Sequence, residues 1–495
     1  MSDTESFVHR FFWDTEDLQT YPWPNRYVQG PEILSYLQHV VAKHDMRKHI
    51  QLNSAVVDAS WDDSAAVWVA TTEAGEKFTG RYLITAPGAL HKATYPDIPG
   101  LNTFEGVLVH SSQWDDDLNL AGKRVGVVGC GATGVQIVTA IAPQVECLVS
   151  FQRTPQYSVP AHNYPISSQQ RALVNVHYDQ IVEQVWKSMS GFGFAESTRP
   201  TMSVGPEERQ RIFEDLWTAG QGIHFMLGGF GDLFNDLEAN EEACAFIRKK
   251  IQQIVKDPET AEQVTPREPF ARRPLCDSGY YETLNRDNVQ VISCRENPIA
   301  ALTQTGIEMR DGTKFELDVI IFATGFEAFT GAYTCFPIRG REGKLLTDHW
   351  NEGGRSYLGI SCSGFPNMFM INGPLTPFGN MAATMQAVTR PISRLIEAAE
   401  SLGRQGGKET GYGCTIEAEP EAETQWFQHC QDMAEGSLFK STNSYFFERD
   451  AEGQPTAVRV FLGGLKMWGD TVDDVLNDGN RGFAIVRRAS SRVTG

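Results

Sequence analysis

The chain has 495 residues, enough for roughly three domain-sized units, which excludes a peptide hormone or a disulfide-stapled miniprotein. Its hydrophobic (41%), aromatic (11%) and charged (21%) shares are those of an ordinary folded protein. The net charge of −19 repels phosphate backbones and anionic lipids. We therefore expect neither a nucleic acid nor a membrane as a partner.

The nine cysteines are scattered, without a C-x-x-C pair or a His/Cys cluster at metal spacing. The sequence thus predicts neither a metal site nor a disulfide framework. Residues 1–5 lack the basic and apolar regions of a secretion signal, and no apolar run is long enough to span a membrane. A cytoplasmic location is the default expectation.

Short apolar runs that end in glycine alternate with helical patterns, which is typical of α/β units with parallel strands. Three runs are each predicted to be a buried strand leading into a turn, namely 82–88, 124–129 and 319–325. Between about 166 and 260 the pattern indicates helices, which predicts a helical insertion.

Within this insertion, one helix face is predicted to hold Ile212, Phe213, Leu216 and Trp217. Further along the chain, an acidic run extends from Glu417 to Glu423. We expect this run to be a solvated helix face.

A G-x-G-x-x-G motif directly follows the second apolar run and opens a helical pattern. Its glycines permit a tight turn, a close approach to a pyrophosphate, and packing of the helix on the strand. The helix N-terminus then faces the anion. We predict a dinucleotide site with contacts from Gly129, Cys130, Gly131, Ala132, Thr133, Gly134, Val135 and Gln136.

The next predicted strand, 146–151, should be followed by an acid for NAD or by a base for NADP. Arg153 lies about 20 residues beyond the glycines, where a guanidinium can hold a 2′-phosphate. The sequence therefore favours NADP, and the alternative is a surface arginine at a strand end.

Five residues upstream of the motif have a fixed joint spacing: Phe104, Gly106, His110, Trp114 and Asp115. Taken singly, His110 and Trp114 would be interpreted as core residues. Together with the downstream glycines, the spacing resembles the fingerprint of the Baeyer–Villiger monooxygenases. These flavoproteins use FAD, NADPH and dioxygen to insert an oxygen atom beside a ketone carbonyl.

The resemblance covers nearly the whole chain and looks closest to the cyclohexanone monooxygenase branch. It implies an α/β, two-dinucleotide-binding-domain flavoprotein fold with a helical insertion. The expected domains are a partial FAD domain (1–117), an NADP domain (118–326) and the second FAD segment (327–495). No other G-x-G-x-x-G precedes residue 129, so the FAD domain is expected to be incomplete at its N-terminus.

The resemblance also implies roles for individual residues. Arg273 matches the family's active-site arginine and Asp3 its partner, while Arg272 is a second 2′-phosphate contact. The segment 151–160 resembles the NADP-contacting segment, which supports Arg153 and Thr154. Further cofactor contacts are expected from Asp3, Thr4, His9, Val56 and Met381.

Two segments, 372–378 and 445–450, depart from the family pattern near the place where relatives line the substrate site. The leading hypothesis is an FAD- and NADPH-dependent Baeyer–Villiger monooxygenase that acts with dioxygen on a cyclic or alkyl ketone. One alternative is a flavin monooxygenase that oxidises nitrogen or sulfur. The other is a non-catalytic NADPH-binding protein, since the FAD motif is absent.

Overall fold

The computed structural model describes residues 1–404 and 414–487, and the chain forms two compact units. Unit 1 consists of Met1–Thr4, Ala93–Pro165 and Glu196–Phe326. Unit 2 consists of Glu5–Lys92, Ile166–Ala195 and Glu327–Gly495.

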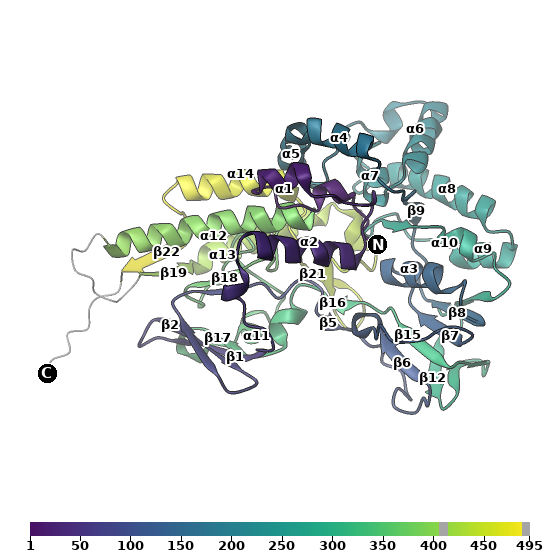
Figure 1. Ribbon diagram of the computed structural model, residues 1–495, viewed down its shortest axis with the longest axis horizontal. Coiled ribbons are helices and arrows are strands. Elements are labelled where there is room, and N and C mark those ends of the chain that lie inside the picture. The colour runs from purple at the N-terminus through teal and green to yellow at the C-terminus, as the bar shows by residue number, and fades with distance from the viewer. Residues whose placement is uncertain (405–413, 488–495) are drawn as a thin grey trace. The chain divides into compact units, whose positions relative to one another are not determined.

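Unit 1 is built on a five-stranded parallel sheet (Figure 1). In spatial order its strands are β11 (Val289–Ser293), β8 (Cys147–Gln152), β7 (Arg124–Val128), β15 (Val319–Phe322) and β6 (Val107–His110). The three inner strands are buried along almost their whole length, as expected of a parallel sheet that is covered on both faces.

Helix α3 (Ala132–Ile141) packs against β7. A core cluster joins the sheet to a three-stranded antiparallel meander of β12 (Ile299–Thr303), β13 (Gly306–Met309) and β14 (Lys314–Glu316). The meander contributes Leu302, Ile307 and Met309, which pack with sheet residues such as Phe151 and Phe322. The central strands are therefore buried, and their carboxyl ends form one edge of the sheet.

The helical part of unit 1 contains α6 (Pro206–Ala219), α7 (Gly222–Leu227), α8 (Leu237–Ile254), α9 (Pro258–Val264) and α10 (Tyr280–Thr283). On α6, Phe213, Leu216 and Trp217 are buried as predicted, whereas Ile212 is half-buried. Two short parallel strands, β9 (Ser158–Pro160) and β10 (Leu275–Asp277), join this part to the nucleotide-binding segment.

Among its described residues, unit 2 contains four small sheets. They are the four-stranded β17 (Ile338–Arg339), β1 (Val56–Asp62), β2 (Val67–Thr72) and β3 (Lys77–Gly80), and the pairs β18 (Met368–Met370) with β4 (Leu83–Thr85), β19 (Cys414–Ala418) with β22 (Phe483–Arg487), and β20 (Phe447–Arg449) with β21 (Pro455–Val458). The short strands β5 (Lys92–Ala93) and β16 (Phe326–Glu327) lie where the chain passes between the units.

The helices of unit 2 are α1 (Thr15–Thr20), α2 (Gly30–Lys43), α4 (Ser168–Val176), α5 (Tyr178–Lys187), α11 (Leu346–His349), α12 (Met381–Arg404), α13 (Pro420–Glu435) and α14 (Gly464–Asn477). Apolar clusters among the described residues hold this unit together. One of them surrounds Trp61, Trp68, Trp350 and Phe365.

The domain boundaries differ from those expected from sequence. Residues 93–117 belong to unit 1, because β6 pairs with β15 in the five-stranded sheet. Residues 166–195, expected within the insertion of the NADP domain, belong to unit 2, where α5 packs beside Phe12 and Leu465.

Two further expectations were wrong in part. The run at 82–88 forms β4, but Ile84 is half exposed, because in the described chain β4 has a single neighbour, β18. The acidic run is not simply solvated: Glu417 bonds to Arg341, and Glu423 is buried against His349.

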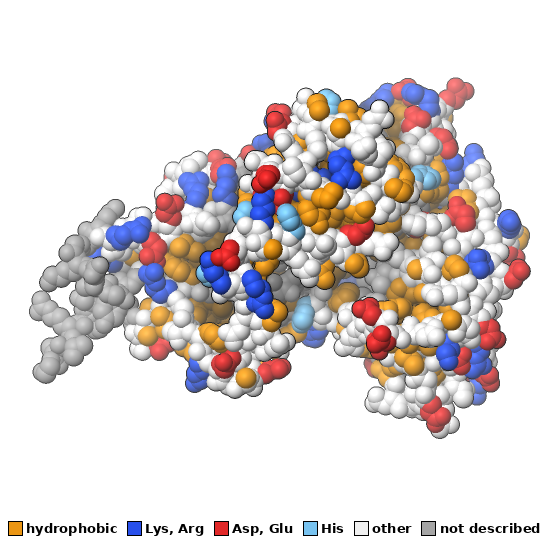
Figure 2. Space-filling view, in the orientation of Figure 1, with side chains coloured by type: hydrophobic (Ala, Val, Ile, Leu, Met, Phe, Trp, Pro, Cys, Tyr) orange, Lys and Arg blue, Asp and Glu red, His pale blue; other side chains and the backbone are white. Residues whose placement is uncertain are grey.

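Acidic and basic side chains are interspersed over the face seen in Figure 2. All nine cysteines lie in the described residues and are free. Within residues 1–404 and 414–487, no helix is both long and apolar enough to cross a membrane.

Candidate cofactor-binding and active site

The glycine motif forms a tight cradle at the carboxyl end of β7. Gly129 has a φ of +114°, and a Cβ there would lie 2.4 Å from the carbonyl oxygen of Ala323. A Cβ on Gly134 would lie 2.1 Å from the carbonyl oxygen of Gly129. Only glycine fits at both positions, so strand, turn and helix approach each other as a dinucleotide cradle requires.

This cradle lies at a topological switch point of the sheet, where the order in which successive strands are added reverses. From β7 the chain passes through α3 to β8 on one side, while β15 lies on the other side of β7. Ligands of open α/β sheets bind in the crevice at such a point. The free N–H groups of the first turn of α3 favour an anion there.

Several predicted contacts in this motif have their side chains engaged elsewhere. Cys130 is buried and donates a hydrogen bond to the Thr154 carbonyl oxygen (3.1 Å), and burial raises the pKa of its thiol to about 11. Val135 is buried in the core, and Gln136 bonds to the chain N-terminus. The motif therefore offers a ligand mainly backbone groups of Gly131, Ala132 and Thr133.

Arg153 and Arg272, both predicted to hold a 2′-phosphate, lie close enough to Cys130 for each to lower the pKa of its thiol. Arg153 and Thr154 line a pocket of about 260 Å³ together with Glu268 and Arg295. Three guanidinium groups (Arg153, Arg267, Arg295) and four carboxylates line this pocket, while Arg272 lines an adjoining pocket that shares Pro155 and Glu268. The pocket is the candidate site for the phosphate, which its guanidinium groups can hold in a fork.

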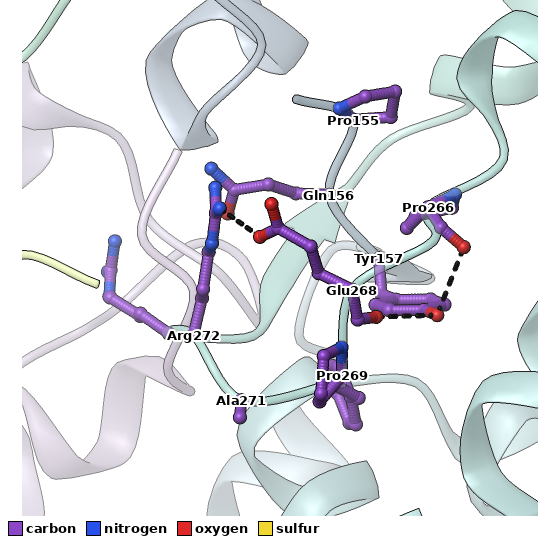
Figure 3. A pocket seen from close by; sticks show the side chains of 10 residues that line it. Pro155, Gln156, Tyr157, Pro266, Glu268, Pro269, Ala271 and Arg272 are labelled. Atoms are coloured by element: carbon purple, nitrogen blue, oxygen red, sulfur yellow. Dashed lines mark hydrogen bonds and ion pairs between the residues drawn. The ribbon is translucent and has the colours of Figure 1, made fainter. Parts of the chain in front are cut away.

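Sequence reasoning missed Glu268. Its carboxylate pairs with Arg272, as Figure 3 shows, and also with Arg295 at 3.2 Å. Its carbonyl oxygen accepts a hydrogen bond from the Tyr157 hydroxyl (3.0 Å). The four-residue spacing between Glu268 and Arg272 was the available signal, although they lie in a loop and not on a helix.

Arg273 forms an ion pair with Asp3, so the predicted contact between them is confirmed. Both side chains are partly exposed, at 33% and 15%. Residues 1–4 are held on α3, because the Met1 amino group donates to Gln136 Oε1 (2.9 Å) and Gln136 Nε2 donates to the Met1 carbonyl oxygen (3.0 Å). Thr4 is buried and turns back on Ser2, whose hydroxyl donates to its carbonyl oxygen (2.6 Å).

Asp277 is a second residue that the sequence did not single out. It is buried, accepts hydrogen bonds from the Ser158 hydroxyl and from the N–H groups of Gly279 and Tyr280 (both 2.8 Å), and burial raises its pKa. It joins β9 to β10 and so fixes the loop of Arg272 and Arg273 against the segment that follows Arg153.

The fingerprint residues have structural reasons for their spacing. A Cβ on Gly106 would lie 2.4 Å from the Phe104 ring and 2.5 Å from the Asp318 carbonyl oxygen, so the ring can cover the backbone only at glycine. His110 ends β6, is buried, and accepts a hydrogen bond from the Ser112 N–H (3.2 Å). Trp114 is 38% exposed, and Asp115 accepts from the Asp117 N–H (2.9 Å).

His110 packs against Tyr95 and Phe326, with ring centroids 5.2 and 5.5 Å away. Burial lowers the pKa of His110, an effect partly opposed by the backbone of Gly325. His110 thus connects β6 to the turn of residues 323–326, which follows β15 at the carboxyl edge of the same sheet.

The three remaining predicted contacts lie in unit 2. Val56 begins β1 and Met381 begins α12, and both are partly exposed. His9 follows Val8, whose carbonyl oxygen accepts from Asn380 Nδ2 (2.9 Å). The buried Asn380 therefore brings the chain near His9 and the start of α12 together, a role with no sequence signal.

The two segments that depart from the family pattern pack on each other. The Phe378 and Phe446 rings have centroids 4.7 Å apart, and the Phe378 N–H donates to the Phe461 carbonyl oxygen (3.4 Å). Because the two segments share this aromatic contact, a substitution in either one changes the same packing region of unit 2.

Comparison with known proteins was made by sequence and by structure. A family model described as "Flavin-binding monooxygenase-like" matches residues 15–160. The chain is 42% identical over 485 residues to cyclohexanone 1,2-monooxygenase of Acinetobacter sp, covering 98% of this chain and 88% of that protein. The chain belongs to the Baeyer–Villiger flavin monooxygenase family.

Two further comparisons refine this assignment. The chain is 42% identical over 492 residues to phenazine N-monooxygenase of Lysobacter antibioticus, covering 99% of this chain and 89% of that protein. The crystal structure of cyclohexanone monooxygenase from Rhodococcus sp. Phi1 bound to NADP+ matches with a TM-score of 0.94 and 43% identity, over 98% of this chain and 90% of that one. The expected two-domain flavoprotein fold of this Baeyer–Villiger family is confirmed.

Proposed function

We propose that this chain is an FAD- and NADPH-dependent monooxygenase that inserts one oxygen atom beside the carbonyl of a ketone, giving an ester or lactone. The observation that carries the proposal is the ion pair between Arg273 and Asp3 in the unit that also holds the glycine cradle. A permanent cation and a candidate nucleotide cradle on the same folded unit support the proposal.

The residues of unit 1 fit NADP. The backbone at Gly131–Thr133 binds the pyrophosphate at the start of α3. Arg153 and Arg272 hold the 2′-phosphate, and Glu268 keeps the Arg272 guanidinium in place. A nucleotide without that phosphate loses these charge-assisted hydrogen bonds, which gives the preference for NADPH.

A second glycine cradle, for the FAD pyrophosphate, is not in the sequence. The glycine pair in the turn of Phe461–Lys466 does not supply one. A Cβ on Gly464 would lie 2.2 Å from the Met189 side chain, so Met189 occupies the space beside this glycine. In this family, NADPH supplies hydride and the flavin activates dioxygen. The steps attributed to this chain therefore come from residues of unit 1.

Arg273 presents its guanidinium to the oxygen anion that develops at the substrate carbonyl. Since a guanidinium stays charged at any working pH, the stabilisation requires no proton transfer. Asp3 orients the guanidinium, and the contact of Met1 with Gln136 holds Asp3 on α3. The Ser158–Asp277 bond fixes the Arg273 loop from the other side.

Oxidation of an aromatic ring nitrogen is a second candidate, favoured by the phenazine N-monooxygenase, which is as similar to this chain as cyclohexanone 1,2-monooxygenase is. The Phe378–Phe446 contact lies in the two segments that depart from the family pattern: Phe446 is buried and holds the partly exposed Phe378 ring, against which a flat ring system can stack.

The test supplies the purified chain with FAD, NADPH and ¹⁸O₂, and offers cyclohexanone and phenazine in separate reactions. One labelled oxygen in a lactone supports ketone oxygenation, whereas a labelled phenazine N-oxide without lactone transfers the assignment to nitrogen oxidation. NADPH consumption that yields only hydrogen peroxide with both substrates contradicts both assignments.

A further inference from the structure

Three side chains that can bind metals meet inside unit 2. They are His349 at the end of α11, Cys362 in the loop before β18, and Glu423 in the first turn of α13. One ligand atom from each lies within 4.8 Å of the others. Their separation in sequence explains why no local spacing predicted a metal site.

The three groups are held in place before any ion arrives. Cys362 is fully buried, and Glu423 is 3% exposed. The Cys362 thiol and the Trp350 indole N–H both bond to the Arg355 carbonyl oxygen, at 3.2 and 2.7 Å. An apolar shell that includes Phe365 and Met368 surrounds the thiol. Such a shell orients ligands and excludes bulk water.

The buried carboxylate needs a positive partner. Among the described residues, the only ion-pair partner of Glu423 is His349, at 2.9 Å, and an imidazole is a cation only when protonated. A buried carboxylate without a cation is costly. The positive end of α13 offsets a part of that cost, and a divalent cation bound between the carboxylate and a neutral imidazole offsets more.

The donor set and its dimensions suit zinc. Thiolate, imidazole and carboxylate are its three usual protein ligands, at about 2.0 to 2.3 Å. Ligand atoms around a tetrahedral ion are then about 3.5 Å apart, so the present separations need to change by only about an ångström. The His349 side chain is 12% exposed, which leaves a route for the ion and for a water as fourth ligand.

We propose that His349, Cys362 and Glu423 form a zinc site that ties α11, the loop before β18 and α13 together. The Zn²⁺ replaces the thiol proton, which leaves to solvent, and no electron is transferred. The site is independent of the monooxygenase assignment. It makes unit 2 a metal-stabilised unit, in contrast to the metal-free chemistry of NADPH and flavin.

The test uses the full chain, stripped with a chelator and dialysed, then titrated with Zn²⁺ against a zinc indicator and separately with Co²⁺. We expect one Zn²⁺ per chain, a rise in melting temperature, and a near-ultraviolet thiolate-to-cobalt absorption band. Cys362→Ser should abolish the band, and His349→Ala and Glu423→Gln should each weaken binding at least about 100-fold, more than loss of an outer partner costs.

Cys430→Ser is the matched control, because Cys430 is also fully buried and lies on α13 with Glu423, but is not in the cluster. It should keep the cobalt band and the affinity for Zn²⁺. Circular dichroism of each variant before titration verifies folding. If the folded wild-type chain shows no thiolate band, or if Cys362→Ser and Cys430→Ser bind Zn²⁺ equally, the site is a His–Glu ion pair beside an inert thiol and the proposal is overturned.

Discussion

The two units assemble their polar groups in different ways. In unit 1, the cradle, Arg153 and His110 follow strands of one parallel sheet and meet at one edge of it. In unit 2, the strands form four small sheets, and polar residues such as Asn380 and Glu423 bond to segments far away in sequence. A site on a parallel sheet is thus visible in local sequence, whereas a site made by long-range packing is not.

Arg273→Lys should have the largest effect, because lysine keeps the charge but loses the planar fork that pairs with Asp3 and that we propose stabilises the substrate oxyanion. We expect the rate of product formation to fall about 100- to 1,000-fold, with the affinity for NADPH within about twofold of wild type. Steady-state kinetics and NADPH titration measure the two quantities. Equal losses in rate and nucleotide affinity would mean that Arg273 is a structural residue of the cradle.

Gly134→Ala and Gly469→Ala compare a tightly packed glycine of unit 1 with an open glycine position in unit 2. The Cβ of Gly134→Ala would meet the Gly129 backbone at 2.1 Å, so we expect a loss of about 3 kcal/mol in the free energy of unfolding and of NADPH binding. Gly469→Ala, inside α14 with open space around it, should instead stabilise by about 1 kcal/mol. Urea unfolding of both variants checks the pair, and equal signs would contradict the cradle geometry.

The sequence predicted what depends on local pattern: the strands β7, β8 and β15, the glycine turn, and the position of Arg153. The Asp3–Arg273 pair came from resemblance alone, since these residues are distant in sequence. Asp277, Glu268 and the burial of Glu423 were missed, because each depends on a partner brought in by folding. Boundary errors had the same origin, as β6 joins unit 1 only through its pairing with β15.

Arg153→Gln and Arg272→Gln should each weaken NADPH binding about tenfold to a hundredfold, the worth of a charged hydrogen bond, and should leave NADH binding unchanged. Arg310→Gln is the control, because Arg310 is exposed in the same unit but lines neither the pocket of Arg153 nor the adjoining pocket of Arg272. Fluorescence titration with both nucleotides measures the affinities. An equal loss for NADH would place these arginines elsewhere than at the 2′-phosphate.

The smallest expected effect is the contribution of His110 to the pH dependence of the free energy of unfolding. Burial lowers its pKa, so below the unfolded value of about 6.5 the unfolded chain binds more protons, and stability falls as pH falls. His110→Asn, which can still accept the Ser112 N–H, should reduce this slope. Denaturant unfolding between about pH 5 and 8 compares the two proteins, and identical slopes would show that His110 titrates normally.

The central claim, ketone oxygenation by this chain, is tested most directly by product analysis with cyclohexanone, NADPH and added FAD. We expect ε-caprolactone carrying one oxygen atom from O₂, formed in step with NADPH oxidation and formed about 100- to 1,000-fold more slowly by Arg273→Lys. NADPH oxidation that produces only hydrogen peroxide, or lactone formation that Arg273→Lys leaves intact, would contradict it.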